Sequence, residues 1–286
     1  MMGYPLAFGC AWNNLGRPFL KSPSHPREAV CFGGLVMTAL DYLGYQQNGN
    51  FCDDMSRKAA WRILRLGKLI NDYYDLGCLD KRGYIAEKRA LREDREVLPD
   101  YSLYRTQISR LEKARPIPPI PGDEGEERIF RYREQTNLVS SAMVCVAGLG
   151  LNFEDLVDTK DLKIAENAPA WFEGLFSLVM ALQIIDDWVG WRGDLGAKRP
   201  SFFTAFIGED ISPENISSEQ LKEIFVLMNE KSKGYLSRAH EIFGSGPLYK
   251  STDLIVTLLP LIFKWTKKRS GKFRKLFFTN RDVENL

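Results

Sequence analysis

Apolar residues recur at intervals of three and four along most of this chain, and the strict alternation that marks a β-strand is nearly absent. Such a pattern predicts amphipathic helices, which must bury their apolar sides against one another. We therefore expect an all-α fold of roughly eight or more helices. The stretches with helical spacing are 29–43, a long helix from Asp54 or Ser56 toward Asp75, 86–97, 127–148, 168–189, 218–243 and 251–268.

Two stretches break this pattern. Residues 1–26 are rich in Gly, Pro, Asn and Ser and are predicted to form an irregular lead-in. Residues 115–127, RPIPPIPGDEGEE, hold too many prolines for a regular helix and are predicted to form a loop. The loop is short enough to lie inside one domain, so residues 1–286 are expected to form a single-domain helical bundle.

The composition excludes several classes of protein. A hydrophobic share of 44% is that of a globular chain, and the net charge of +2 does not favour a nucleic-acid partner. Five scattered cysteines favour reduced thiols and a cytoplasmic protein. No apolar run reaches the roughly 18 residues of a membrane span, and the first residues do not resemble a secretory signal.

The first of two acidic segments is KLINDYYDLGCLDKRG, residues 68–83. Asn71, Asp72 and Asp75 are three and four residues apart, so all three can point from one side of a helix. The segment follows the apolar stretch ILRLGKLI and ends in basic residues.

The second acidic segment is QIIDDWVGWRGDLGAKRP, residues 183–200. Asp186 and Asp187 end the apolar run FSLVMALQII. Asp194 follows Asp186 by eight residues, which places it near the same face if the helix continues. Lys198 and Arg199 come directly after it.

Carboxylates in two such segments suit magnesium and a diphosphate. Mg²⁺ prefers oxygen ligands and bridges carboxylates to phosphate oxygens, while Lys and Arg neutralise the remaining charge. That arrangement stabilises the charge on a leaving diphosphate. A lone Asp-x-x-Asp on a helix is usually a solvated face, but unpaired carboxylates beside apolar stretches are costly and imply cationic partners.

The two segments together resemble the aspartate-rich motifs of the trans-isoprenyl diphosphate synthases and the related class I terpene synthases. LINDYYD is similar to the first motif, with Asn71 in its first Asp position, and KRG at 81–83 is similar to the basic run that follows it. QIIDDWVGWRGDLGAKRP is similar to the second motif. YREQTNLVSSAMVCVAGLG, residues 132–150, is similar to the helix that carries a Lys-Thr pair, here Gln135 and Thr136. The order of elements agrees over roughly residues 27–250.

The resemblance implies a helical bundle of the isoprenoid synthase type around a deep central cavity, with Mg²⁺ and a prenyl diphosphate of ten to twenty carbons at its mouth. It implies catalytic and metal-binding roles for Asp72, Asp75, Asp186 and Asp187, with Asn71 and Asp194 as further metal ligands. A homodimer is expected by analogy alone.

The resemblance also implies residues for the two ends of the substrate. Arg82 and Lys198 are expected to contact phosphate together with Gln135 and Thr136. Arg131 and Arg133, which flank Gln135, are candidates to replace the missing lysine, Arg131 first because it lies one turn before Gln135, although such arginines are more often exposed. The side chains expected to line the cavity are Tyr73, Phe172, Phe176, Met180 and Trp188, although a stripe at helical spacing is first of all core.

Departures from the family pattern bear on which reaction is expected. Asn71 replaces a carboxylate, Gly190 stands where a third aspartate is usual, and Gln135 replaces a lysine. The cationic groups that hold a second diphosphate in chain-elongating relatives are only loosely matched by Lys21 and Arg27. This loss favours a terpene cyclase with one diphosphate substrate.

Two alternatives remain open from the sequence. One is a prenyltransferase that joins a prenyl diphosphate to isopentenyl diphosphate or another acceptor. The other is a non-catalytic regulatory subunit of a prenyl diphosphate synthase, which the lost ligands would fit. Seven basic residues between 264 and 275 form a cluster that is expected to be a solvated tail, with peripheral contact to an acidic membrane surface as its alternative.

Overall fold

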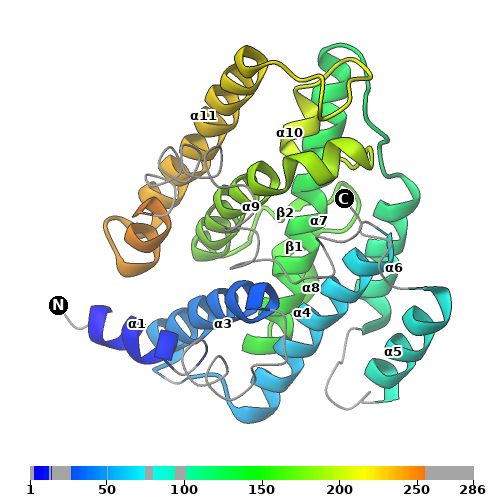
Figure 1. Ribbon diagram of the computed structural model, residues 1–286. Helices are drawn as coiled ribbons and strands as arrows, with labels where there is room; N and C mark the ends of the chain where they lie inside the picture. Colours follow the sequence, from blue (N-terminus) through cyan, green and yellow to red (C-terminus); the bar gives the residue numbers. More distant parts are fainter. Residues whose placement is uncertain are drawn as a thin grey trace. The chain divides into compact units, whose positions relative to one another are not determined.

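The computed structural model describes residues 3–12, 14, 27–49, 51–74, 80–93 and 101–254, and helices dominate this part of the chain (Figure 1). The all-α prediction is confirmed. Within the described residues, β structure is limited to one antiparallel pair of two-residue strands, β1 (Val157–Asp158) and β2 (Lys163–Ile164). Among the described helices, none has the length and apolar character that would let it cross a membrane.

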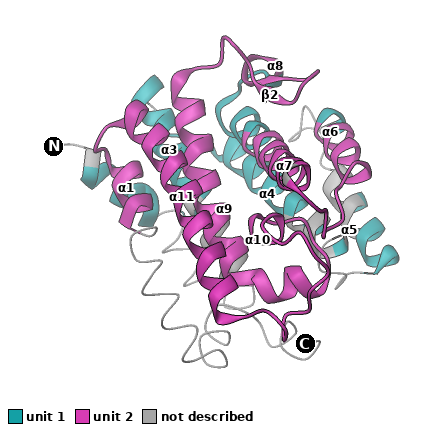
Figure 2. Cartoon of the chain, turned by 90° about the horizontal axis from the view of Figure 1, so that it is seen from above, with its two compact units in different colours: residues 1–103, 142–153, 260–286 teal, residues 104–141, 154–259 magenta. Residues whose placement is uncertain are grey.

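The chain divides into two compact units, which Figure 2 colours separately. Unit 1 comprises residues 1–103, 142–153 and 260–286, and unit 2 comprises residues 104–141 and 154–259. Each unit is therefore assembled from stretches that lie far apart in the sequence. The expectation of a single domain over residues 1–286 stays a prediction.

Unit 1 is built on long amphipathic helices. Its helices are α1 (Gly3–Ala11), α3 (Arg27–Asn48), α4 (Asp54–Tyr74), α5 (Lys81–Glu93) and the end of α7 (Asp123–Leu149). Asp53 caps α4, since its Oδ1 accepts a hydrogen bond of 2.7 Å from the N–H of Ser56. The core includes Leu40 and Ala60, and Gly148 of α7 lies so close to both that a Cβ there would meet the Leu40 side chain at 3.2 Å.

A buried carboxylate, Asp41 on α3, is fully paired inside unit 1. Arg57 on α4 donates to both of its oxygens, at 2.9 and 3.3 Å, and Asn14 donates to it at 2.7 Å. The backbone N–H of Cys52 adds a fourth bond at 3.3 Å. Asp41 is 1% exposed, so this network satisfies a charge that would otherwise be costly to bury. These hydrogen bonds link Asp41 of α3 to Arg57 of α4 and to Asn14, which follows α1.

The prediction of an irregular lead-in over residues 1–26 is wrong for residues 3–11, which form α1. Pro5 lies in the first turn, where its missing N–H costs no helical hydrogen bond. Burial of Cys10 at 1% exposure then holds the helix in place despite its glycines. Residues 1, 2, 13 and 15–26 lie outside the described residues.

Unit 2 is built around α9 (Ala170–Gly196). Its other helices are most of α6 (Tyr101–Lys113), the first part of α7, α8 (Phe153–Leu156), α10 (Phe202–Ala205), α11 (Ser218–Phe243) and residues 247–254. Residues 174–181 of α9 are all buried, as expected of a helix that is apolar on every side. Gly174 permits close packing on α11, because a Cβ there would meet the Phe243 ring at 2.6 Å.

Several element boundaries differ from the predicted ones. The loop predicted over residues 115–127 is shorter, because α7 already begins at Asp123. α5 begins at Lys81 rather than at 86, and α9 extends past 189 to Gly196. Of the helix predicted over residues 251–268, only 251–254 are described, and they are helical. Charged helix ends carry little apolar periodicity, which is why the sequence placed these limits too far inward.

Candidate functional site

The second acidic segment lies on the C-terminal half of α9. The helix continues through Asp194, as the predicted spacing of two turns from Asp186 requires. The three carboxylates have different surroundings. Asp186 is exposed, Asp187 is 3% exposed, and the side chain of Asp194 is 19% exposed.

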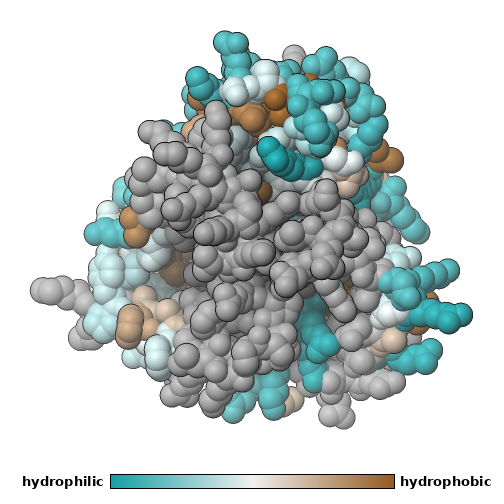
Figure 3. Space-filling view, in the orientation of Figure 1, coloured by the Kyte–Doolittle hydropathy of each residue, from teal (hydrophilic) through white to brown (hydrophobic). Residues whose placement is uncertain are grey.

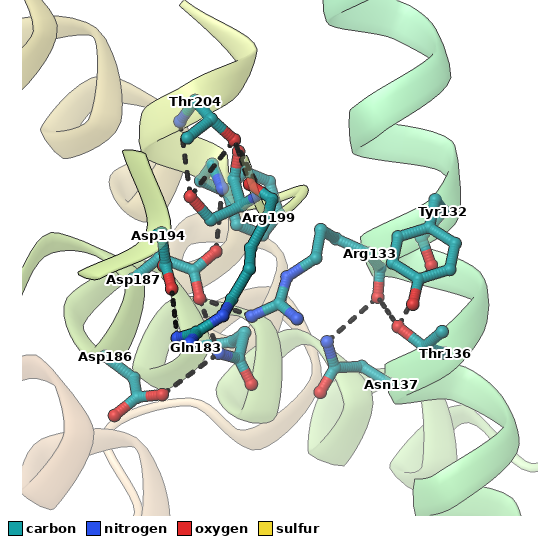
Figure 4. A network of polar contacts seen from close by, with 12 residues as sticks. Tyr132, Arg133, Thr136, Asn137, Gln183, Asp186, Asp187, Asp194, Arg199 and Thr204 are labelled. Carbon is teal, nitrogen blue, oxygen red and sulfur yellow. Dashed lines mark hydrogen bonds and ion pairs between the residues drawn. The ribbon is translucent and has the colours of Figure 1, made fainter. Parts of the chain in front are cut away.

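The buried Asp187 is paired with Arg133, which reaches across from α7 (Figure 4). Its Oδ1 accepts from the Arg133 guanidinium and, at 2.8 Å, from the Gln183 amide one turn earlier on α9. Burial alone would lower the pKa of Arg133, but Asp187 and then Asp194 more than offset this, and the pKa is raised. Arg133 is therefore a permanently charged group in a nearly dry position.

The second oxygen of Asp187 anchors the start of α10. Its Oδ2 accepts a hydrogen bond of 2.7 Å from the N–H of Phe202, the first residue of that helix. A carboxylate at a helix N-terminus satisfies an N–H that has no partner within the helix. The Ser201 side chain accepts from the N–H of Thr204 and completes the cap. Asp187 thus joins α7, α9 and α10.

A tight turn at the end of α9 brings Arg199 back beside the helix. The N–H of Lys198 bonds to the Leu195 carbonyl and the N–H of Arg199 bonds to the Asp194 carbonyl, which is the hydrogen-bond pattern of a Schellman motif. Lys198 takes the left-handed position with φ 51°, where glycine is usual. The Arg199 guanidinium then lies 3.6 Å from the Asp194 carboxylate, and Thr204 Oγ1 donates to the Arg199 carbonyl at 2.7 Å.

The resulting cluster holds two carboxylates and two guanidinium groups. Burial, and next the neighbouring charge of Asp187, raise the pKa of Asp194 to about 7, although Arg133 and Arg199 act in the opposite direction. The Nε–H groups of Arg133 and Arg199 are buried and have no hydrogen-bond partner among the described residues. Unpaired donors on buried cations are uncommon, and an anion with several oxygens would satisfy them.

The described carboxylates fit a magnesium ion only in part. Asp187 already accepts three hydrogen bonds, two of them at Oδ1, so it offers little to a metal. Asp186 and Asp194 are two turns apart, about 12 Å along the axis, too far to ligate one ion together. Gly190 lies between them and brings no ligand, although a Cβ there would be 3.8 Å from Asp194 Oδ2. Within the described residues, no three His, Cys, Asp or Glu side chains gather as a metal site.

Only part of the first acidic segment lies within the described residues, and for some of these only the backbone is described. Asn71 and Asp72 lie on α4, as predicted, but their side chains are outside the described residues, and so is all of Asp75. Tyr73 is described, and its ring stacks on Tyr84 with centroids 4.3 Å apart. This segment belongs to unit 1 and the second to unit 2, so their convergence on one diphosphate stays a prediction.

The residues of unit 2 that were predicted to bind diphosphate have contacts of their own outside the Asp187 cluster. Arg131 and Lys198 are exposed and pair with Glu127 and Asp210, at 2.5 and 2.7 Å. Gln135 donates to the Asp161 carbonyl at 3.0 Å, and the Thr136 hydroxyl donates to carbonyls of its own helix. Arg82 is exposed near the start of α5 in unit 1.

The cavity-lining residues of α9 are buried. Phe172, Phe176 and Met180 are 9% exposed or less, and Trp188 packs on Phe203 and Phe225 with centroids 5.9 and 5.2 Å apart. Packed core and cavity wall both require such burial, so the lining role stays a prediction. Unit 2 has a shallow hollow lined by Pro118, Pro119 and side chains from residues 195–211, with a cavity volume of only about 10 Å³, far below the roughly 300–1,000 Å³ of most ligand pockets.

The cations that approach these carboxylates are not the two that the sequence interpretation favoured for phosphate. Arg133 and Arg199 approach the carboxylates, whereas Arg131 and Lys198, each one or two positions away, face solvent. The signal for Arg133 was present. It follows the buried Ile129 by one turn and therefore lies on the apolar side of α7.

Comparisons with protein family models, with curated proteins and with solved structures gave no match to this chain. The resemblance to the isoprenoid synthases therefore rests on the two acidic segments and on the order of the helices.

Proposed function

We propose that this chain is a class I terpene synthase, which ionises a prenyl diphosphate with Mg²⁺ and releases diphosphate. The observation that carries the proposal is the placement of Arg133 and Arg199 against the acidic segment Asp186–Asp194. Two guanidinium groups on side chains that are 18% and 17% exposed, each with a buried Nε–H that has no partner among the described residues, suit an anion that presents several oxygens.

In this proposal the two arginines hold the diphosphate. The planar guanidinium group can donate to two phosphate oxygens at once. Asp187 fixes the position of Arg133 and of the Phe202 backbone, and Gln183 in turn donates to Asp187, so Asp187 is a positioning residue rather than a free metal ligand. Donors that are fixed in advance stabilise the charge that develops on a leaving group at little reorganisation cost.

The metal belongs to the exposed side of the cluster. We assign one ion to the exposed Asp186 and, because the spacing of two turns forbids a shared ion, a second one to Asp194. Asp72 and Asp75 stay the ligands that the resemblance implies for the first segment. Mg²⁺, when bound, would neutralise the diphosphate and favour its departure. A buried aromatic lining such as Phe172, Phe176 and Trp188 would then shelter the carbocation from water.

The test is incubation of the purified protein with MgCl₂ and geranyl, farnesyl or geranylgeranyl diphosphate, with and without isopentenyl diphosphate. A hydrocarbon or alcohol formed from one substrate alone, and lost on addition of EDTA, supports the cyclase. A longer prenyl diphosphate formed only with isopentenyl diphosphate supports the prenyltransferase. Gas chromatography with mass spectrometry separates these products.

A matched pair of variants tests the arginine assignment. Arg199→Gln should reduce kcat by roughly a hundredfold, which is typical when one donor to a developing negative charge is removed. Arg131→Gln, which alters an exposed arginine paired with Glu127, should leave kcat within about twofold. Equal losses in the two variants would overturn the assignment.

A second candidate function has its own supporting observation. The Arg133–Asp187 pair neutralises a carboxylate that the resemblance assigns to metal, and this is what a non-catalytic subunit would tolerate. That candidate predicts no turnover with any of the substrates. It also predicts that the chain changes the product length of an active prenyl diphosphate synthase when the two are mixed.

A further inference from the structure

Helix α1 exposes an aromatic face. Tyr4, Phe8 and Trp12 are four residues apart and therefore lie along one side of the helix and its immediate continuation. Their side chains are 50%, 74% and 51% exposed. In the region of α1, Figure 3 shows a few brown atoms among pale ones, because the hydropathy scale counts Phe as hydrophobic and Tyr and Trp as nearly neutral.

The opposite side of α1 faces unit 1. Cys10 is 1% exposed, and Asn14 is 1% exposed and bonded to Asp41. The sequence holds no charged residue before Arg17, so α1 is uncharged on every side. A helix without a polar face is normally buried all round. The exposed aromatic face of α1 therefore lacks the solvated surface that a peripheral helix usually has.

We propose that this face inserts into the interfacial layer of a lipid bilayer and holds the protein on a membrane surface. Tyr and Trp are enriched at that layer because their rings are apolar and their O–H and N–H groups remain near water. A helix lying in the interface buries one apolar face and needs no span of the membrane. This inference is independent of the proposed reaction.

Two features favour lipid over a protein partner. A buried aromatic side chain contributes roughly 150–250 Å², so three partly exposed rings offer on the order of 400 Å². A stable protein interface needs about 800 Å² from each partner. The face also has no charged group to orient a partner. A second copy of this chain is therefore a less suitable occupant than a bilayer.

The experiment is co-sedimentation of the full chain with phosphatidylcholine vesicles. The wild type should sediment with them, and it should do so equally at low salt and at 0.5 M NaCl, because α1 is uncharged. The triple variant Tyr4→Ser, Phe8→Ser, Trp12→Ser should lose at least tenfold in partitioning. The control variant Ile117→Ser, Val226→Ser, Leu227→Ser changes three other exposed apolar side chains and should bind as the wild type does.

A second measurement does not depend on how well the triple variant folds. Brominated phosphatidylcholine should quench part of the tryptophan fluorescence of the wild type, and Trp12→Phe, which keeps the aromatic face, should remove that part. Absence of binding to phosphatidylcholine would overturn the inference. So would binding that needs anionic lipid and disappears in salt, which points to the basic residues 264–275, or a dimer in solution that the triple variant abolishes.

Discussion

Arg133 of α7 donates a hydrogen bond to the carboxylate of Asp187 on α9, and both side chains are largely withdrawn from water. The adjacent Asp186 is exposed. Two consecutive aspartates of one motif thus have different physical roles. One holds the fold together around a buried cation, and the other is accessible to a ligand.

Replacing Asp187 and replacing Asp186 should have different effects on stability. Asp187→Ala leaves Arg133 as a buried unpaired charge and should lower the free energy of unfolding by about 3–5 kcal/mol. Asp186→Ala should change it by less than about 0.5 kcal/mol but should strongly reduce turnover. Urea denaturation and the product assay measure the two effects. Equal stability of the two variants would show that the buried pair is misassigned.

Replacing both Arg133 and Asp187 should destabilise the protein less than replacing only one of them. In Arg133→Met with Asp187→Leu, no buried charge is left unpaired, although the N–H of Phe202 loses its acceptor. The double variant should therefore be more stable than Asp187→Leu alone by about 1–3 kcal/mol. The four proteins of a double-mutant cycle, compared by urea denaturation, give the coupling. Purely additive effects would contradict a direct interaction.

The pH dependence of stability should reflect Asp194. Its pKa in the folded chain, about 7, lies above the ordinary value of 3.8, so between these values the folded chain binds more protons than the unfolded one. The stabilisation is complete below about pH 4 and is lost as the pH rises through 7. Asp194→Asn should flatten this decline and should be more stable than the wild type at pH 8.

Denaturation at pH 5, 6, 7 and 8 measures this dependence. The exposed Asp210, which pairs with Lys198 at the surface, provides the control. Asp210→Asn should keep the slope of the wild type. A wild-type stability that does not fall between pH 5 and pH 8 would exclude the raised pKa of Asp194.

The left-handed conformation of Lys198 predicts an unusual substitution effect. Glycine adopts a φ of 51° without the steric cost of a Cβ, so Lys198→Gly should be more stable than Lys198→Ala by about 1 kcal/mol. Both variants lose the ion pair with Asp210, which cancels in the comparison. If Lys198 contacts phosphate, both also lose turnover. Thermal melts and the product assay distinguish the two effects.

In unit 1, breaking the Asp41 network should destabilise the protein as much as breaking the Asp187 pair. Arg57→Met removes both bonds from the guanidinium to a carboxylate that is 1% exposed, which should cost about 3–5 kcal/mol. Lys58→Met changes an exposed neighbour on the same helix and should be nearly neutral. A small effect of Arg57→Met would mean that Asn14 and Cys52 suffice to hold Asp41.

The sequence located most of the long helices but not α1 or α6, and it did not show which charged side chains face the interior. Apolar spacing located α4, α9 and α11 because their buried sides repeat at helical intervals. It could not distinguish Arg131 from Arg133, since the choice depends on which side of α7 meets α9. The sequence analysis also missed the buried role of Asp41 in α3, because the sequence does not distinguish a buried, paired aspartate from a solvated one. α1 was missed because glycine and proline dominated the local signal.

Glycine at position 190 leaves a gap between Asp186 and Asp194 in the row of carboxylates on α9. Because residue 190 is glycine, no third carboxylate lies on the middle turn beside Asp194, and Arg133 and Arg199 supply positive charge to Asp187 and Asp194. An aspartate introduced at 190 would crowd a third negative group against one that already resists ionisation. A bound cation would then be needed to offset the added repulsion, and glycine at position 190 avoids that need.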